Sequence, residues 1–173
     1  TSQVETCLEK KVDFIITSLG NPKEVIDKCK PLGVKVICDV IDLKYAHKVE
    51  ALGADAVIAV NSNAGGHAGN INPEQLIGEL KTNLSIPIIS AGGVSNSKDI
   101  KDHISYGASG VSVGTVFIAS NEAGVSQEYK QALVDYQAKD VVRSTKMSGS
   151  ALTVINTPYV QSIGTEANWL EKL

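Results

Sequence analysis

The chain has 173 residues, and its 16 basic and 19 acidic side chains give a formal net charge of −3. Hydrophobic residues make up 43% of it, which is typical of a globular domain with one sizeable core. This slight acidity excludes the basic footprint of a nucleic-acid-binding protein, and no apolar run approaches the roughly 18 residues of a membrane span. We therefore expect a cytoplasmic protein with a small-molecule substrate, no nucleic-acid or membrane partner, and homo-oligomer formation left open.

Short, nearly continuous apolar runs alternate with helix signals along the chain. Such runs are typical of parallel strands covered on both faces, and they occupy residues 12–17, 34–40, 54–60, 86–91 and 110–114. Helix N-terminus signals stand between them, namely Asn21-Pro22 with Glu24, Asp42, and Asn72-Pro73 with Gln75. Gly53 lies where a helix over 43–52 would end. A further helix is expected over 127–138, followed by an irregular tail.

Successive βα units of this kind are compatible with two parallel architectures. Because the crossovers between parallel strands are right-handed, such units form either an open doubly wound sheet or a barrel. A complete (β/α)8 barrel needs about 250 residues, so in the second case the chain supplies the C-terminal part of one. We predict a single domain over residues 1–173, with the C-terminal helix and irregular tail at 126–173.

The three cysteines, Cys7, Cys29 and Cys38, are odd in number and form no CxxC pair. This spacing does not fit a disulfide framework or a zinc site, so we expect reduced, mostly buried thiols. No second ligand has a usable spacing from His67, and no metal site is expected.

The loop after the third apolar run, residues 61–70, places His67 among three glycines. Ligands bind at the C-terminal ends of strands in parallel α/β folds. Glycine lets a flat or anionic ligand approach the backbone, and imidazole exchanges protons near neutral pH. His67 is therefore the candidate catalytic residue; the alternative is a flexible loop whose histidine faces water. His47 and His103 lie in predicted helices, where we expect them to face solvent.

The fourth and fifth runs end in glycine turns, Gly92-Gly93 and Gly114-Thr115. Backbone N–H groups at adjacent strand ends, with a threonine hydroxyl, form a phosphate cradle, and barrel phosphate sites commonly follow the last two strands. The alternative is that these glycines only make tight turns. Asp39 and Ser18 also lie at strand ends, where they could contact a ligand, although Asp39 could equally cap the following segment.

Four stretches of the chain form a characteristic set. They are residues 53–59, residues 64–69 with the sequence Ala-Gly-Gly-His-Ala-Gly, residues 87–94, and residues 107–115 ending in Gly-Thr. Together they resemble the nitronate monooxygenase family, formerly called 2-nitropropane dioxygenases, and the related FMN-dependent enoyl-acyl-carrier-protein reductases. The resemblance extends from about residue 12 to 117, with a weaker echo at 147–149.

The resemblance implies a TIM barrel that holds FMN non-covalently, of which this chain supplies strands four to eight. It implies that His67 lies beside the flavin and that the flavin and its phosphate are bound by Gly65, Gly92, Gly93, Ser112, Val113, Gly114 and Thr115. The chain departs from many relatives at Val60-Asn61, where they have glutamine-glycine, at Asn63, where they have glutamate, and at Ser112, where they often have glutamine.

The function implied is that of an FMN-dependent oxidoreductase, a monooxygenase that oxidises alkyl nitronates with oxygen to a carbonyl compound and nitrite. An FMN-dependent enoyl-acyl-carrier-protein reductase is the alternative within the family. From other classes, a flavin-free phosphate-binding barrel enzyme and an inactive fragment with open sheet edges are also compatible with the sequence.

Overall fold

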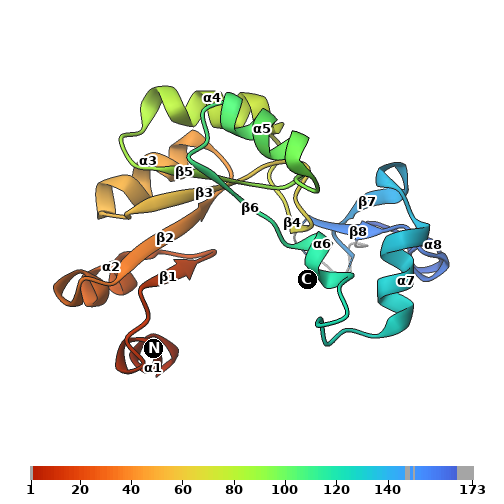
Figure 1. Cartoon of the computed structure of the whole chain (residues 1–173), viewed down its shortest axis with the longest axis horizontal. Helices are drawn as coiled ribbons and strands as arrows, with labels where there is room; N and C mark the ends of the chain where they lie inside the picture. The colour runs from red at the N-terminus through yellow and green to blue at the C-terminus, as the bar shows by residue number, and fades with distance from the viewer. Residues whose placement is uncertain (1, 147–148, 150, 167–173) are drawn as a thin grey trace. The chain divides into compact units, whose positions relative to one another are not determined.

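The computed structural model describes residues 2–146, 149 and 151–166 (Figure 1). The chain forms two compact units. The first unit comprises Thr1–Ser62 and Gly69–Ser112, and the second comprises Asn63–Ala68 and Val113–Leu173.

The first unit is built on a five-stranded sheet in the order β1-β2-β3-β5-β6, in which all neighbouring strands are parallel. The strands are β1 (Phe14–Thr17), β2 (Lys35–Val40), β3 (Ala56–Val60), β5 (Ile88–Ala91) and β6 (Gly110–Ser112). Each strand lies beside the one that precedes it in this sheet, so the order runs in one direction without the reversal that defines a doubly wound sheet. The fold is therefore part of a (β/α)8-type barrel, and the five predicted strands are confirmed with slightly shorter bounds.

The predicted N-caps Asp42 and Asn72 are confirmed, whereas the helix after Asn21 has Pro22 as its N-cap, and the N-terminal helix was not predicted. The helices of the first unit are α1 (Ser2–Glu9), α2 (Lys23–Cys29) continued by the 3-10 turn η1 (Lys30–Leu32), α3 (Leu43–Leu52), α4 (Pro73–Asn83) and α5 (Ser97–Ser105). Asp42 accepts a hydrogen bond from the Tyr45 backbone N–H at 2.7 Å, and Gly53 ends α3 with φ 98°. Asn72 accepts one from the Gln75 backbone N–H at 2.9 Å.

Helices α2, α3 and α4 bury one face of this sheet. The core comprises Ile26, Cys29, Val36, Cys38, Val40, Ala46, Val49, Ala54, Val57, Ala59, Leu76, Leu80 and Ile88. Alternation along the strands puts Phe14, Ile16, Ile37 and Asp39 on the other side, called the opposite face below. Phe14 and Ile16 are each 52% exposed there.

The three cysteines are free thiols, as expected, and Cys29 and Cys38 are buried. The Thr17 hydroxyl donates to the Cys38 sulfur at 3.3 Å, on the helix-covered side of the sheet. Burial raises the pKa of both buried thiols, which keeps them in the unreactive protonated form.

The second unit contains a small antiparallel sheet that the sequence did not indicate. Its strands are β4 (Gly66–His67), β7 (Val141–Ser144) and β8 (Leu152–Ile155), in the order β4-β8-β7. Its helices are α6 (Thr115–Ile118), α7 (Gln127–Asp135), the 3-10 turn η2 (Ala138–Asp140) and α8 (Pro158–Ile163). The tail expected to be irregular thus holds two strands and a helix. The prediction missed them because runs this short are stabilised by distant pairing, here with β4, rather than by local preference.

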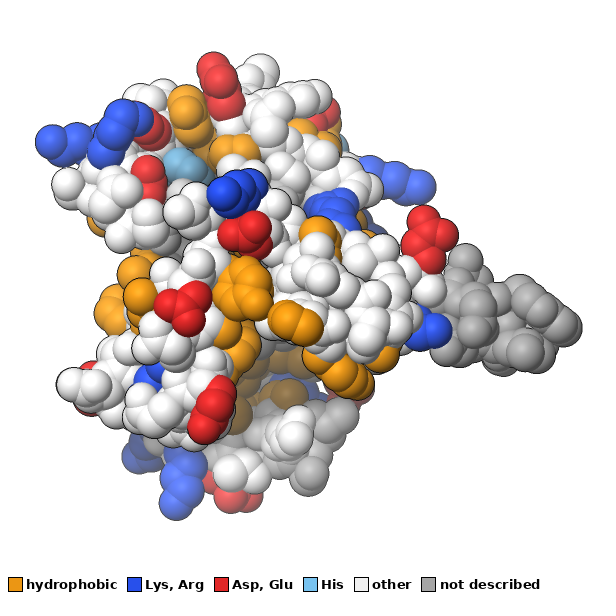
Figure 2. Space-filling model, turned by 90° about the vertical axis from the view of Figure 1, so that its right-hand side faces the viewer, with side chains coloured by type: hydrophobic (Ala, Val, Ile, Leu, Met, Phe, Trp, Pro, Cys, Tyr) orange, Lys and Arg blue, Asp and Glu red, His pale blue; other side chains and the backbone are white. Residues whose placement is uncertain are grey.

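None of the helices within the described residues combines the length and apolar character needed to cross a membrane. On the face drawn in Figure 2, acidic and basic side chains are interspersed, and exposed apolar side chains lie among them. Met147 and Ser148, from the weaker C-terminal resemblance, lie outside the described residues.

Candidate functional site

The predicted site residues divide between the two units. Gly92, Gly93 and Ser112 belong to the first unit, at the C-terminal ends of β5 and β6. The second unit contains the remaining ones, namely Gly65, His67, Val113, Gly114 and Thr115.

In the first unit, the turn after β5 has the conformation that its two glycines allow. Gly92 has φ 111° and Gly93 has φ 75°, both in the region that side chains with a Cβ rarely adopt. Ala91 pairs with Ser112, so this turn and the end of β6 are neighbours on the sheet. The N–H groups of Gly93 and Val94 donate no hydrogen bond within the described part of the chain, which leaves them available to an anion.

Asn61 fixes this turn from the neighbouring strand, a role that the sequence reasoning missed. It is completely buried, and its side-chain amide donates to the Gly92 carbonyl at 3.0 Å. Its backbone N–H donates to the Ala91 carbonyl at 3.1 Å. The sequence signal for this role was a polar residue directly after an apolar strand. Asn61 therefore holds the ends of β3 and β5 together beneath the glycine turn.

The backbone N–H groups at the start of α5 already donate hydrogen bonds to side chains of the same segment. The Asp99 carboxylate accepts hydrogen bonds from the backbone N–H groups of Ser95 (2.8 Å) and Asn96 (3.2 Å). In return, Asn96 accepts from Lys98 and Asp99 at 2.9 and 3.1 Å, which completes a capping box. An anion at this strand end would thus be bound by the glycine turn rather than by the helix start.

In the second unit, His67 lies on a strand rather than in a free loop. Gly66 pairs with Thr153, and His67 pairs with Leu152 of β8. The histidine side chain is exposed, while Ala64 before it is 5% exposed. The pairing therefore fixes the backbone of a solvent-accessible imidazole.

Two other predicted residues of the second unit come together beside this strand. A Cβ added to Gly65 would lie 3.1 Å from the Thr115 hydroxyl oxygen, so the two residues are in contact. Gly114 has φ −125°, and a Cβ added there would meet nothing within 4 Å. Packing among the described residues thus does not require glycine at position 114.

Gly69, the last glycine of the histidine motif, has a packing role instead. A Cβ at this position would lie 2.5 Å from the Val60 carbonyl oxygen and 3.3 Å from the Ile41 Cβ. The backbone of residue 69 can approach the end of β3 only because it has no side chain.

The expectation that His103 faces solvent is wrong. The residue is 4% exposed, and its Nδ1 lies 2.8 Å from the Ser90 hydroxyl of β5. Burial lowers the pKa of His103, although Asp99 and Asp102 act in the other direction. This histidine joins α5 to the sheet as a neutral hydrogen-bonded group. His47 has a half-exposed side chain, as expected.

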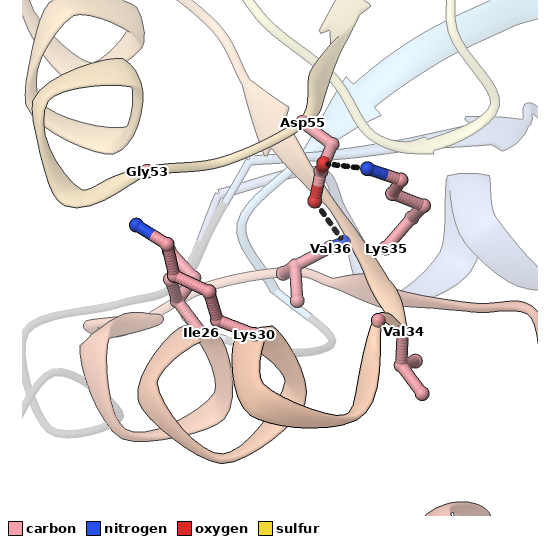
Figure 3. Close-up of a pocket in the computed structure, with 8 residues that line it drawn as sticks. Ile26, Lys30, Val34, Lys35, Val36, Gly53 and Asp55 are labelled. Carbon is pink, nitrogen blue, oxygen red and sulfur yellow. Dashed lines mark hydrogen bonds and ion pairs between the residues drawn. The ribbon is translucent and has the colours of Figure 1, made fainter.

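A pocket of about 160 Å³ lies at the other ends of the strands, between α2, β2 and the start of β3 (Figure 3). The Asp55 carboxylate there accepts hydrogen bonds from the Lys35 ammonium at 2.8 Å and the Val36 backbone N–H at 2.9 Å. Although burial alone would raise it, these two bonds lower the pKa of Asp55. Asp55 therefore joins the beginnings of β2 and β3, a structural role typical of the N-terminal face of such folds.

Comparison with known proteins identifies relatives of the whole chain. A family model described as nitronate monooxygenase matches residues 1–171. A (3aS,4S,5R,7aS)-5-hydroxy-7a-methyl-1-oxo-octahydro-1H-indene-4-carboxyl-CoA dehydrogenase from Rhodococcus jostii is 31% identical, over 96% of this chain and 47% of the relative. A probable nitronate monooxygenase from Staphylococcus aureus is 28% identical, over 92% of this chain and 48% of the relative. The chain thus spans about half the length of the curated relatives it matches.

The chain is also similar to solved structures. FabK from Thermotoga maritima is 34% identical and superposes with a TM-score of 0.86, covering 92% of this chain and 51% of that chain. A nitroalkane oxidase from Streptomyces ansochromogenes shares the fold, with a TM-score of 0.86 at 24% identity, covering 99% of this chain and 53% of that chain.

Proposed function

Because the chain belongs to the nitronate monooxygenase family, we propose that the protein is an FMN-dependent oxidoreductase that converts alkyl nitronates and oxygen to a carbonyl compound and nitrite. The observation that supports this most directly is the placement of His67. Its glycine-rich motif pairs with β8, which presents an accessible imidazole on fixed backbone. The backbone of a histidine on a flexible loop would not be held by strand pairing.

Two features of the glycine turns support the binding of a flavin phosphate. The turn at Gly92-Gly93 has free N–H groups at Gly93 and Val94 among the described residues, and Asn61 holds it in place. Gly114 leaves space that a Cβ would fill. We propose that these backbone groups bind the phosphate, with Gly65, Ser112, Val113 and Thr115 lining the cofactor.

When bound, the flavin would supply the electron transfer from nitronate to oxygen, which leaves binding, orientation and proton transfer to the protein. His67 can donate a hydrogen bond to the nitro group or move a proton, because its side chain is accessible and an imidazole ring can both donate and accept a hydrogen bond. We assign that role to His67.

The second candidate is oxidation or reduction of an acyl thioester. The relative at 31% identity is by its name a dehydrogenase of a CoA thioester. Such a reaction would use the same flavin site and a nicotinamide, and it corresponds to the enoyl-thioester reductase alternative.

The test uses the protein purified from its complete reading frame. A yellow protein that releases FMN on denaturation supports the cofactor assignment, whereas a colourless protein that does not take up added FMN contradicts it. Oxygen consumption with ethyl nitronate distinguishes the first function from nicotinamide-dependent reduction of an enoyl thioester. His67→Ala should retain flavin and melting temperature while losing about 10² to 10⁴ in turnover. Unchanged turnover would remove His67 from the site.

A further inference from the structure

The pocket between α2, β2 and the start of β3 has no part in the proposed reaction (Figure 3). It lies at the N-terminal ends of the strands, whereas the glycine turns follow their C-terminal ends. Ile26 and Val36, each 2% exposed, form its apolar floor and belong to the core on the helix side of the sheet, away from the opposite face. Its volume of about 160 Å³ is close to that of a cavity that holds benzene. The pocket therefore suits a small ligand with an apolar side.

Gly53 keeps this pocket open toward α3. The residue ends α3 with φ 98°, and an added Cβ would lie 3.6 Å from Ile26 Cγ2 and 4.0 Å from Lys30 Nζ. A side chain at this position would therefore cover both the apolar floor and the lysine ammonium. In Figure 3 the Lys30 ammonium points toward Gly53. An apolar surface and a cation thus face the same space.

Lys30 carries a positive charge that its neighbours do not neutralise. Within the part of the chain that the structure describes, its ammonium forms no ion pair or hydrogen bond. Both acidic side chains of α2 are paired with other lysines, at 2.5 and 3.1 Å, and the one of α3, Glu50, accepts a hydrogen bond from the Ser85 backbone N–H at 2.7 Å. Asp55 is bound to Lys35 at 2.8 Å, and the charge of Lys30 acts on it only from farther away. Two ammonium groups and one carboxylate line the pocket, which leaves an excess of one positive charge.

We propose that this pocket is a second binding site, which takes a small monocarboxylate with an apolar body such as an aromatic ring. The carboxylate accepts hydrogen bonds from the Lys30 ammonium and neutralises the excess charge, while the ring packs on Ile26 and Val36. A dianion such as phosphate fits less well, because the backbone N–H groups of Gly33, Gly53 and Val36 already donate to acceptors of the protein. This inference does not depend on the proposed function.

Benzoate is the probe, titrated into the protein purified from its complete reading frame and followed by ligand-detected NMR. We expect a Kd on the order of 1 mM for a ligand of this size. Benzyl alcohol, which has the ring without the charge, should bind at least about fivefold more weakly, and benzylamine should bind more weakly still. Benzylamine binding as tightly as benzoate, or no saturable benzoate binding up to about 20 mM, overturns the proposal.

Variants of the pocket locate the binding. Lys30→Gln should weaken benzoate binding at least about fivefold, because it removes the charge. Lys44→Gln is the matched control, since it removes an exposed lysine from the start of α3, and it should bind like wild type. Gly53→Ala should also weaken binding by covering the floor, and its melting temperature shows whether it folds, because alanine is strained at φ 98°. If Lys30→Gln binds benzoate like wild type, the site is not this pocket.

Binding at the C-terminal strand ends is the competing result, because a carboxylate resembles a nitronate in shape and charge. We expect His67→Ala to bind benzoate like wild type, and the absorbance of any bound flavin to stay unchanged during the titration. Weaker binding in His67→Ala together with normal binding in Lys30→Gln overturns the proposal and places benzoate in the candidate flavin site.

Discussion

Two glycine-to-alanine substitutions test whether the glycines at the strand ends serve packing or ligand binding. Gly69→Ala places a Cβ 2.5 Å from the Val60 carbonyl oxygen, a backbone atom that cannot rotate away. Overpacking of this kind costs about 1 to 3 kcal/mol. For a chain of this size, each kcal/mol lowers the melting temperature by about 2 to 4 °C, so we expect a decrease of about 2 to 12 °C.

Gly114→Ala is the matched substitution, because a Cβ there meets nothing within 4 Å and φ is negative. Its melting temperature without added flavin should stay within about 2 °C of wild type, while flavin affinity falls at least fivefold. Differential scanning calorimetry and flavin titration measure the two effects. If Gly69→Ala melts like wild type, the loop after β4 does not approach β3 as described. If Gly114→Ala binds flavin normally, residue 114 does not line the cofactor.

Four further substitutions test other parts of the structure. Gly93→Val should lower flavin occupancy several-fold, because residue 93 has φ 75° and its N–H group would be screened; unchanged occupancy would place the phosphate elsewhere. Cys29→Ala and Cys38→Ala should each lower the free energy of unfolding by about 1 kcal/mol but spare turnover per folded molecule, and a selective loss of turnover would give that thiol a role in the site. Asp55→Asn should lower the free energy of unfolding by about 1 kcal/mol at pH 7, allowing for the partial exposure of Asp55. This difference should shrink as the pH falls below 3.8, the ordinary pKa of aspartate. A difference that stays constant with pH would contradict the ion pair with Lys35.

Local signals explain why the first unit could be predicted from the sequence. Continuous apolar runs belong to buried parallel strands, and Asp42 and Asn72 cap helices through atoms only three residues away. The antiparallel sheet of the second unit has no such local signal. The strand at His67 is two residues long and exists because it pairs with residue 152, far along the chain. The sequence indicated His67 as a candidate site residue, but it did not indicate that this residue lies on a paired strand.

Helix α5 shows a second limit, because its large apolar residues do not mark its most buried position. Ile100 and Ile104 are the large apolar residues of this helix, yet they are 40% and 44% exposed. His103 is buried instead, because Ser90 on β5 offers its ring a hydrogen bond. A polar pair between a helix and a strand requires knowledge of both elements, which hydrophobic patterning of one element does not provide.

Asp39 and Asp55 differ in how their charge affects the fold, because the pKa of Asp39 is raised and that of Asp55 is lowered. Because the pKa of Asp39 is raised in the folded protein, the folded state binds more protons than the unfolded state above the ordinary aspartate value of 3.8. The carboxyl group therefore destabilises the fold progressively as pH rises from about 4 through the raised pKa, and by a constant amount at higher pH. Asp39→Asn removes this effect and should melt above wild type at pH 7, with the two melting temperatures converging near pH 4. Thermal melts of apoprotein at both pH values measure it. A variant that is less stable than wild type at pH 7 would show that the Asp39 charge supports the fold.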